Sequence, residues 1–196
     1  TASMGETYEA LAQFQNAAET YRRFATNWPS DKRAPNALYN AAILYRGVKK
    51  ADLAAATFEE LYKRFPNHEA ANNSLFESAR IRETIAGSTN ASSTYKEFLS
   101  NPANRNSENG LYAQAKIIEL QLAKNPSDQS VRKELQKLSS NLRSKTNVPA
   151  TEARRVVASI MFNEQENQQR AFKAMKLTSG EEIEKQAKLK QSKLES

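Results

Sequence analysis

The side chains that most often carry chemistry are scarce in this sequence and form no catalytic pattern. His68 is the only histidine and the chain has no cysteine, so it cannot form a multi-histidine metal site, a disulfide or a thiolate nucleophile. The five glycines are scattered singly, which excludes a glycine-rich phosphate-binding loop. We therefore predict that the chain has no enzymatic activity, no metal and no cofactor.

Adjacent carboxylates are the remaining candidates for chemistry. The pairs Glu59–Glu60 and Glu181–Glu182 have the residue type for general acid and base catalysis, which needs a cleft that separates two pKa values. Both pairs fall in stretches typical of solvated helix surface, so we expect neither to be catalytic. His68 follows Phe65-Pro66-Asn67, and we expect it in a turn with a surface or capping role, rather than in proton transfer or metal binding.

The composition indicates which elements must position these residues. Of 196 residues, 39% are hydrophobic and 26% are charged, and five glycines and six prolines are few for a sheet protein. Strong helix formers such as alanine, leucine, glutamate and lysine are abundant. The longest apolar run, residues 156–162, is far shorter than the roughly 20 residues that cross a bilayer. These features predict an all-α protein without a membrane span.

Large and small apolar residues recur along the chain at a fixed period. Tyr21, Phe58 and Tyr95 are spaced by 37 residues, and an alanine lies four residues before each of them. Three further series share a spacing of 37 and then 36 residues, as one deletion in the third unit predicts. These series are Leu38, Leu75 and Leu111; Tyr39, Phe76 and Tyr112; and Ala42, Ala79 and Ala115.

Each repeated unit is predicted to be a pair of helices. The first has apolar residues at i, i+3, i+4 and i+7, and the second has a similar stripe that ends at a proline. A single pair cannot bury such a face alone, so neighbouring units must stack. The predicted units are residues 1–33, 34–70, 71–106 and, in degenerate form, 107–142, with a C-terminal helical extension at 143–196.

The repeated unit resembles the tetratricopeptide repeat. The second unit carries the resemblance at Leu38, Ala41, Ala42, Tyr45, Ala54, Phe58, Leu61 and Pro66. In the third unit, Arg82 stands where the family has an aromatic residue. The resemblance covers about residues 1–142 and implies an α-solenoid of stacked antiparallel helical hairpins, wound into a right-handed superhelix. The period of 36–37 residues is also similar to that of repeats in bacterial envelope proteins.

The resemblance implies where a partner binds, because the first helices of such a stack line a concave surface. Asparagine amides both donate and accept hydrogen bonds, which suits a peptide backbone, and aromatic rings add apolar contact area. The implied groove takes a peptide segment or helix of a partner protein. Its predicted lining is Asn36, Tyr39, Ile43, Arg46, Asn73, Phe76, Arg80, Glu83, Asn109, Tyr112, Lys116 and Glu119.

A different interpretation of these residues does not involve a ligand. Each asparagine lies where a helix is expected to begin, so it could act as a helix cap. The aromatic rings could equally be half-buried spacers between neighbouring helices. The sequence leaves both interpretations open.

The net charge of +7 is concentrated in the last quarter of the chain. Eleven of the 29 Lys and Arg residues but only seven of the 22 Asp and Glu residues lie in 143–196, which gives this segment a net charge of +4. Its lysines alternate with glutamate and glutamine, as on a solvated helix. Solubility is the main interpretation; the alternatives are an anionic surface or acidic protein partner and, less favoured, nucleic acid.

The segment after Asn147-Val-Pro149 no longer follows the repeat. It predicts a long helix with a polar middle and a second helix from Glu181 onwards, which we interpret as a degenerate pair that continues or caps the solenoid. The alternatives are a dedicated recognition arm and disorder at the extreme end.

The function predicted from the sequence is a non-catalytic protein–protein interaction scaffold. The alternatives are an architectural spacer or an oligomerisation module that self-associates through its solenoid ends, and a nucleic-acid-binding helical repeat. We expect the chain to be a fragment of a longer protein. The resemblance to envelope repeats and the absence of cysteine favour a periplasmic or outer-membrane-associated location over a cytoplasmic one.

Overall fold

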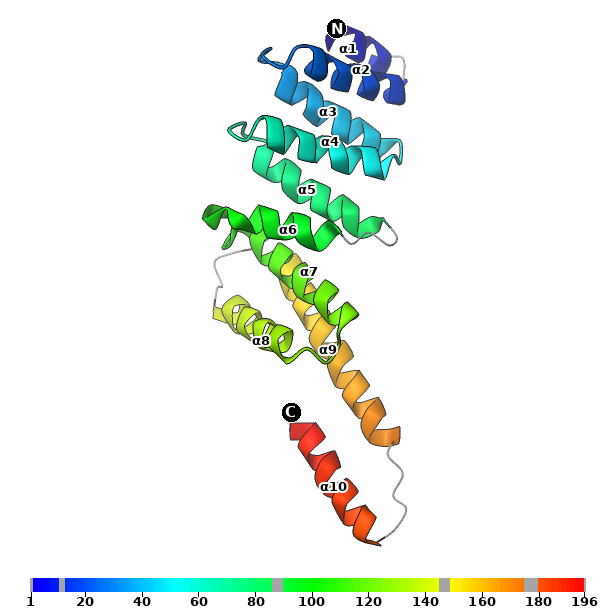
Figure 1. Ribbon diagram of the computed structural model, residues 1–196, viewed down its shortest axis with the longest axis vertical. Coiled ribbons are helices and arrows are strands. Elements are labelled where there is room, and N and C mark those ends of the chain that lie inside the picture. The colour runs from blue at the N-terminus through cyan, green and yellow to red at the C-terminus, as the bar shows by residue number, and fades with distance from the viewer. Residues whose placement is uncertain (1, 11–12, 86–89, 145–148, 175–179, 196) are drawn as a thin grey trace.

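A computed structural model describes residues 2–10, 13–85, 90–144, 149–174 and 180–195, and every regular element within these ranges is helical (Figure 1). The helices follow one another as antiparallel neighbours, as predicted for a helical solenoid. They are α1 (Ala2–Ala10), α2 (Phe14–Asn27), α3 (Ala34–Gly47), α4 (Ala51–Arg64), α5 (Ala71–Thr84), α6 (Asn90–Ser100), the 3-10 turn η1 (Pro102–Asn104), α7 (Glu108–Lys124), α8 (Gln129–Ser144), α9 (Thr151–Ala174) and α10 (Gly180–Glu195).

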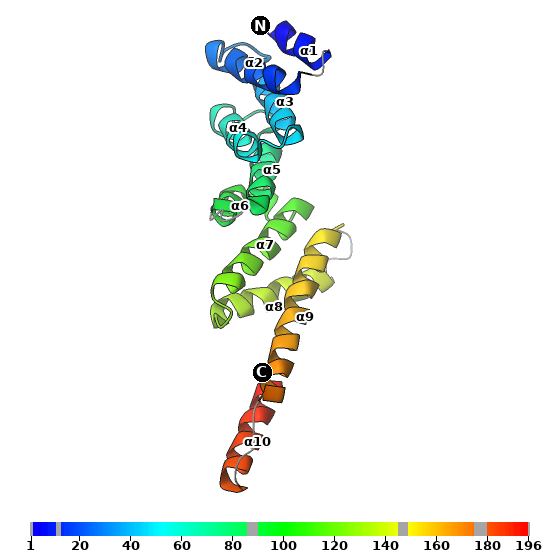
Figure 2. The same cartoon turned by 90° about the vertical axis from the view of Figure 1, so that its right-hand side faces the viewer.

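The first three helix pairs stack in chain order. Each first helix packs against its own second helix and against the second helix of the preceding unit, as α3 does with α4 and α2. Seen edge-on, α1, α3 and α5 lie on one side of the stack and α2, α4 and α6 on the other (Figure 2). We call the surface formed by the exposed residues of α3, α5 and α7 the first-helix face.

The helix ends lie where the sequence predicts them. α2 and α4 end just before Trp28-Pro29 and Phe65-Pro66, because proline lacks the amide hydrogen and disfavours a helical residue before it. The first helix of the fourth unit, α7, is longer at 17 residues and ends before Asn125-Pro126. Gly47 is the last residue of α3.

Small residues let the helices approach closely, as the repeat predicts. The alanines of both repeating series, Ala17, Ala54 and Ala91 and Ala42, Ala79 and Ala115, are at most 1% exposed. In the first unit Gly5 takes this role, because a Cβ there would lie 2.5 Å from Cε1 of Tyr21.

The fourth unit is closed by α9. Leu111 and Ile118 of α7 share one core cluster with residues of α9, among them Val157 and Ile160. The cluster also contains the apolar stripe of α8, which is Val131, Leu135, Leu138 and Leu142. α9 packs chiefly along α7, so it does not take the place of a fifth first helix against α8. α9 therefore contacts the fourth unit mainly through its first helix. None of the α10 side chains that the structure describes is buried, and this helix packs mainly against α9.

Among the described residues, no helix combines the length and the apolar character that a bilayer crossing needs.

Candidate functional site

The adjacent carboxylates on α4 are not on a solvated helix face, so the expectation from the sequence was wrong for Glu59 and Glu60. Glu59 accepts hydrogen bonds from Arg82 Nε at 2.7 Å and from Ser78 Oγ at 2.9 Å, both on α5. Glu60 points the other way, towards α2. Neighbouring repeats supply these partners, and a sequence pattern within one helix does not reveal them. The pair Glu181–Glu182 lies where side chains are not described.

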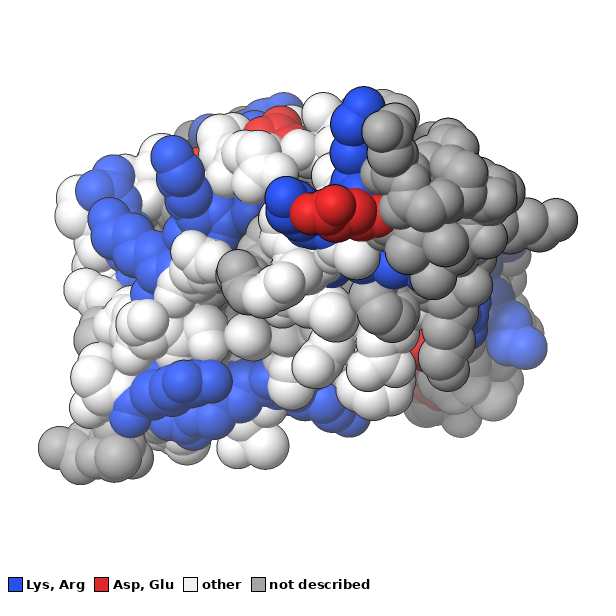
Figure 3. All heavy atoms as spheres, turned by 90° about the horizontal axis from the view of Figure 1, so that it is seen from below, with Lys and Arg blue, Asp and Glu red and all other residues white. Residues whose placement is uncertain are grey.

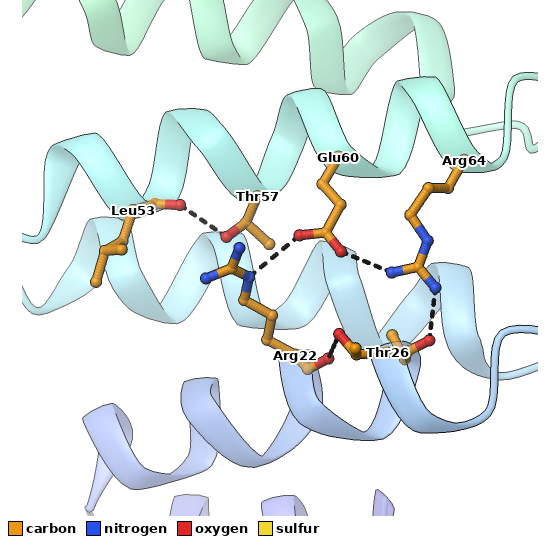
Figure 4. A network of polar contacts seen from close by, with 7 residues as sticks. Arg22, Thr26, Leu53, Thr57, Glu60 and Arg64 are labelled. Atoms are coloured by element: carbon orange, nitrogen blue, oxygen red, sulfur yellow. Dashed lines mark hydrogen bonds and ion pairs between the residues drawn. The ribbon is translucent and has the colours of Figure 1, made fainter.

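Glu60 is the centre of a network that joins the first two repeats (Figure 4). Its carboxylate accepts from Arg22 Nε at 3.1 Å and from Arg64 Nη1 at 2.6 Å. Arg64 Nη2 also donates to the Ala25 carbonyl at 2.7 Å, which ties α4 to the last turn of α2. Both carboxylates of the pair are therefore held by arginines, an arrangement that joins neighbouring repeats in the stack.

Glu59 gives the stability of the chain a pH dependence. Burial raises the pKa of Glu59, but the hydrogen bonds from Arg82 and Ser78 outweigh it and hold the pKa below its ordinary value. A carboxyl group with a lowered pKa in the folded chain stabilises the fold above its unfolded pKa, and this contribution is lost as the pH falls through the folded pKa.

We therefore expect Glu59→Gln to lower the free energy of unfolding by about 1.5–3 kcal/mol at pH 7, the usual contribution of hydrogen bonds to a charged group. The difference from the wild type should shrink as the pH falls from 7 to 3, because protonation of Glu59 removes the charged hydrogen-bond acceptor from the wild type as well. Urea unfolding at both pH values measures it. A difference that is equal at pH 7 and pH 3 would contradict the assigned role of the carboxylate.

His68 occupies the turn between the second and third units, as predicted. Its Nδ1 accepts a hydrogen bond from the Ala70 backbone amide at 3.3 Å, just before α5 begins. This hydrogen bond closes the turn before α5 and does not cap the helix itself. No group of three or more potential metal ligands occurs among the described residues.

The predicted asparagine row does not cap the helices. The residues that precede α3, α5 and α7 are Arg33, Ala70 and Ser107, and only Ser107 caps with its side chain, which accepts from the Gly110 amide. Within the described part of the chain, the side chains of Asn36, Asn73 and Asn109 make no hydrogen bond; Asn36 and Asn73 are exposed and Asn109 is half-buried. The amide groups of Asn36 and Asn73 are therefore available on the first-helix face.

The predicted aromatic row is divided between the surface and the core. Tyr39 is half-buried, with its ring centroid 5.7 Å from that of Phe58. Phe76 is only 3% exposed and packs against Tyr95 and Phe98, so it belongs to the core as the packing interpretation proposed. Phe76 therefore cannot line the predicted groove, because its ring is not exposed to a ligand.

Most charged residues of the predicted groove form ion pairs with neighbouring side chains. Arg46 Nη1 lies 2.7 Å from Glu77 Oε2, which joins α3 to α5. Lys116 Nζ lies 3.1 Å from Glu83 Oε2 and also contacts Glu119 on its own helix. Burial lowers the pKa of Lys116, but Glu119 and Glu83 raise it more, so that the ammonium group stays charged.

Arg80 differs from these paired residues. Its guanidinium lies over two rings, 6.0 Å from the Phe76 centroid and 5.5 Å from that of Tyr112. Its side chain is 44% exposed, and its nearest carboxylate is Glu152 on α9 at 3.9 Å. The half-buried Ile43 occupies the equivalent place on α3 and has no charge to offer a ligand.

Three further residues belong to this surface and were missed in the sequence. Asn40 and Glu77 lie four residues after Asn36 and Asn73, on the same sides of α3 and α5; Asn40 is exposed and Glu77 is half-buried. Helical spacing from the asparagine row would have found both. Glu152 had no such signal, because it reaches the surface only through the packing of α9 on α7.

The C-terminal end of the molecule is basic on the face that Figure 3 shows, where lysine and arginine side chains outnumber acidic ones. Part of this charge is neutralised within single helices, as in Arg170–Glu166 at 2.9 Å and Lys188–Glu184 at 3.2 Å. Such alternation is typical of a solvated helix surface rather than of a nucleic-acid site.

A comparison with known protein families identifies the repeat. The sequence profile of the tetratricopeptide repeat matches residues 3–31 and 36–68, which are the first two helix pairs of the structure. A search of curated protein sequences finds no match for the chain.

Proposed function

We propose that the chain is a non-catalytic scaffold that binds a peptide segment of a partner on its first-helix face. Its first two helix pairs match the tetratricopeptide repeat, and such repeats are in general protein–protein interaction modules. The observation that carries this proposal is the row of exposed asparagine amides on neighbouring helices. Asn36 and Asn40 lie on α3 and Asn73 lies at the equivalent place on α5.

The chemistry of these amides suits an extended peptide. Each offers a donor and an acceptor to a backbone that cannot satisfy its own polar groups. The helices that carry them are fixed by the buried alanines and aromatic rings below, so binding does not require the scaffold to become ordered. Tyr39 and Ile43, both half-buried, add apolar contact area beside the asparagines.

The test is a selection of peptides from a random display library on the full chain. Peptides are selected on the wild type, and their dissociation constants are then measured against the wild type and the double variant Asn36→Ala/Asn73→Ala. We expect the double variant to lose about tenfold or more in affinity, as two unsatisfied peptide groups of about 1 kcal/mol each would cause. Its melting temperature should change little, because both side chains are exposed.

The matched control is Asn27→Ala, which removes an exposed asparagine at the end of α2. This variant should bind the selected peptides like the wild type. If the double variant also binds them like the wild type, the first-helix face is not the binding surface. If the library yields no binder, the peptide-scaffold function itself is wrong.

Self-association is a second candidate, and exposed apolar side chains near the C-terminal end favour it. Phe162 on α9 is 66% exposed and Leu194 on α10 is 60% exposed. Light scattering of the wild type and Phe162→Gln measures this directly. A concentration-dependent mass that the variant abolishes supports the oligomerisation module, whereas a constant monomer mass excludes it.

We also propose a location in the periplasm or at the outer membrane of a bacterium. This proposal rests on the similarity of the 36–37-residue period to that of envelope repeats. Cell fractionation of the full-length protein tests it, and recovery in the cytoplasmic fraction would refute it.

A further inference from the structure

Arg80 lies on α5, the middle helix of the first-helix face, and its guanidinium group can bind an anion. The rings of Phe76 on α5 and Tyr112 on α7 lie beside the guanidinium, with its Cζ 6.0 Å and 5.5 Å from their centroids. A cation–π contact uses none of the N–H donors of an arginine, so these donors remain available for a carboxylate. The exposed amide of Asn73, two turns earlier on α5, lies on the same stripe of the helix.

The carboxylate that meets Arg80 in the structure comes from α9. Glu152 lies in the first turn of that helix, and Glu152 Oε2 is 3.9 Å from Arg80 Nη2. Val156, one turn further along α9, packs with Tyr112 against the same core cluster. The start of α9 therefore covers the part of the first-helix face that α7 contributes.

This ion pair is looser than the others in the described part of the chain. The remaining salt bridges there span 3.2 Å or less, whereas Arg80 and Glu152 are 3.9 Å apart. Both side chains are also nearly half exposed, at 44% and 47%. An exposed ion pair of this kind contributes little to stability, so another carboxylate can replace Glu152 at small cost.

We infer that Arg80 is a carboxylate-binding residue of the peptide site, and that Glu152 occupies it as an internal carboxylate until an acidic partner segment displaces it. This inference rests on the proposed function and specifies the chemistry of the partner. The partner segment carries a carboxylate, from an acidic side chain or from its own C-terminus, at the place that faces Arg80. Glu152 then lowers the affinity of the chain for every partner segment that carries this carboxylate. Removal of the Glu152 carboxylate does not change the affinity for peptides that lack one.

The test uses an array of immobilised octapeptides and three full-chain proteins: the wild type, Glu152→Gln and Arg80→Gln. Each peptide with a central glutamate and an amidated end has a glutamine twin, and a third arm presents neutral peptides with a free C-terminal carboxylate. We expect Glu152→Gln to raise binding to one carboxylate arm about two- to fivefold, the range of an exposed ion pair. Arg80→Gln should bind the glutamate and glutamine twins equally.

The control is Arg23→Gln, because Arg23 is exposed on α2 and does not lie on the first-helix face. This variant should keep the preference for carboxylate peptides. If the wild type and Glu152→Gln bind peptides without any carboxylate preference, the inference about Arg80 is wrong and the peptide scaffold stands. If no peptide binds any of the proteins, both the inference and the proposed function are wrong. The arm that responds identifies the source of the carboxylate.

Discussion

Tyr95→Ala is expected to lower the free energy of unfolding by about 3–5 kcal/mol, the usual cost of removing a fully buried aromatic side chain. Tyr95 is completely buried between the third and fourth units, where its ring centroid lies 6.0 Å from that of Phe76 and 6.3 Å from that of Tyr112. The alanine variant leaves a cavity at the junction of α5, α6 and α7. Urea or thermal unfolding monitored by circular dichroism measures the loss.

Two further variants separate the ring of Tyr95 from its hydroxyl group. The hydroxyl donates to Glu83, and burial raises the pKa of Tyr95, so the side chain stays neutral. Tyr95→Phe removes only this hydrogen bond and should cost about 1 kcal/mol, because Lys116 still pairs with Glu83. Phe162→Ala, at a 66% exposed ring, should change stability by less than about 0.5 kcal/mol. Equal losses for Tyr95→Ala and Phe162→Ala would show that Tyr95 is not a core residue.

Gly110→Ala is expected to destabilise the chain by about 3 kcal/mol, at the upper end of the cost of overpacking. A Cβ on Gly110 would lie 1.8 Å from the Asn104 carbonyl oxygen, far inside van der Waals contact. That oxygen cannot move aside easily, because it accepts hydrogen bonds from the amide of Ser107 at 3.0 Å and from its hydroxyl at 2.7 Å. The turn into α7 must therefore open to admit the methyl group.

Gly47→Ala is the matched control, because no atom lies within 4 Å of a Cβ at this position at the end of α3. Alanine has the higher helix propensity, so this variant should be unchanged or more stable by up to about 1 kcal/mol. Unfolding of the two variants under the same conditions compares them. If Gly110→Ala is as stable as Gly47→Ala, the close approach of η1 to α7 does not exist in solution.

The sequence by itself determined the repeat, and with it most of the fold. The 37-residue spacing placed an alanine and an aromatic residue at corresponding positions of α2, α4 and α6, and all of these residues are buried. The reason is that packing in a stack is local: each unit meets only its neighbours, so the same contacts require the same residue types in every unit. The prolines after α2 and α4 mark the helix ends for an equally local reason.

Only the tertiary structure decided which polar residues are paired and which are available. Glu59 and Glu60 are neighbours in one helix, yet they bind arginines of different helices, and helical spacing contains no information on such partners. Phe76 and Tyr39 share a repeat position, but only Phe76 is enclosed, because the rings of the third and fourth units meet around it. Glu152 reaches Arg80 because α9 leaves the stack and packs along α7, a long-range contact that the periodicity of the first 142 residues does not determine.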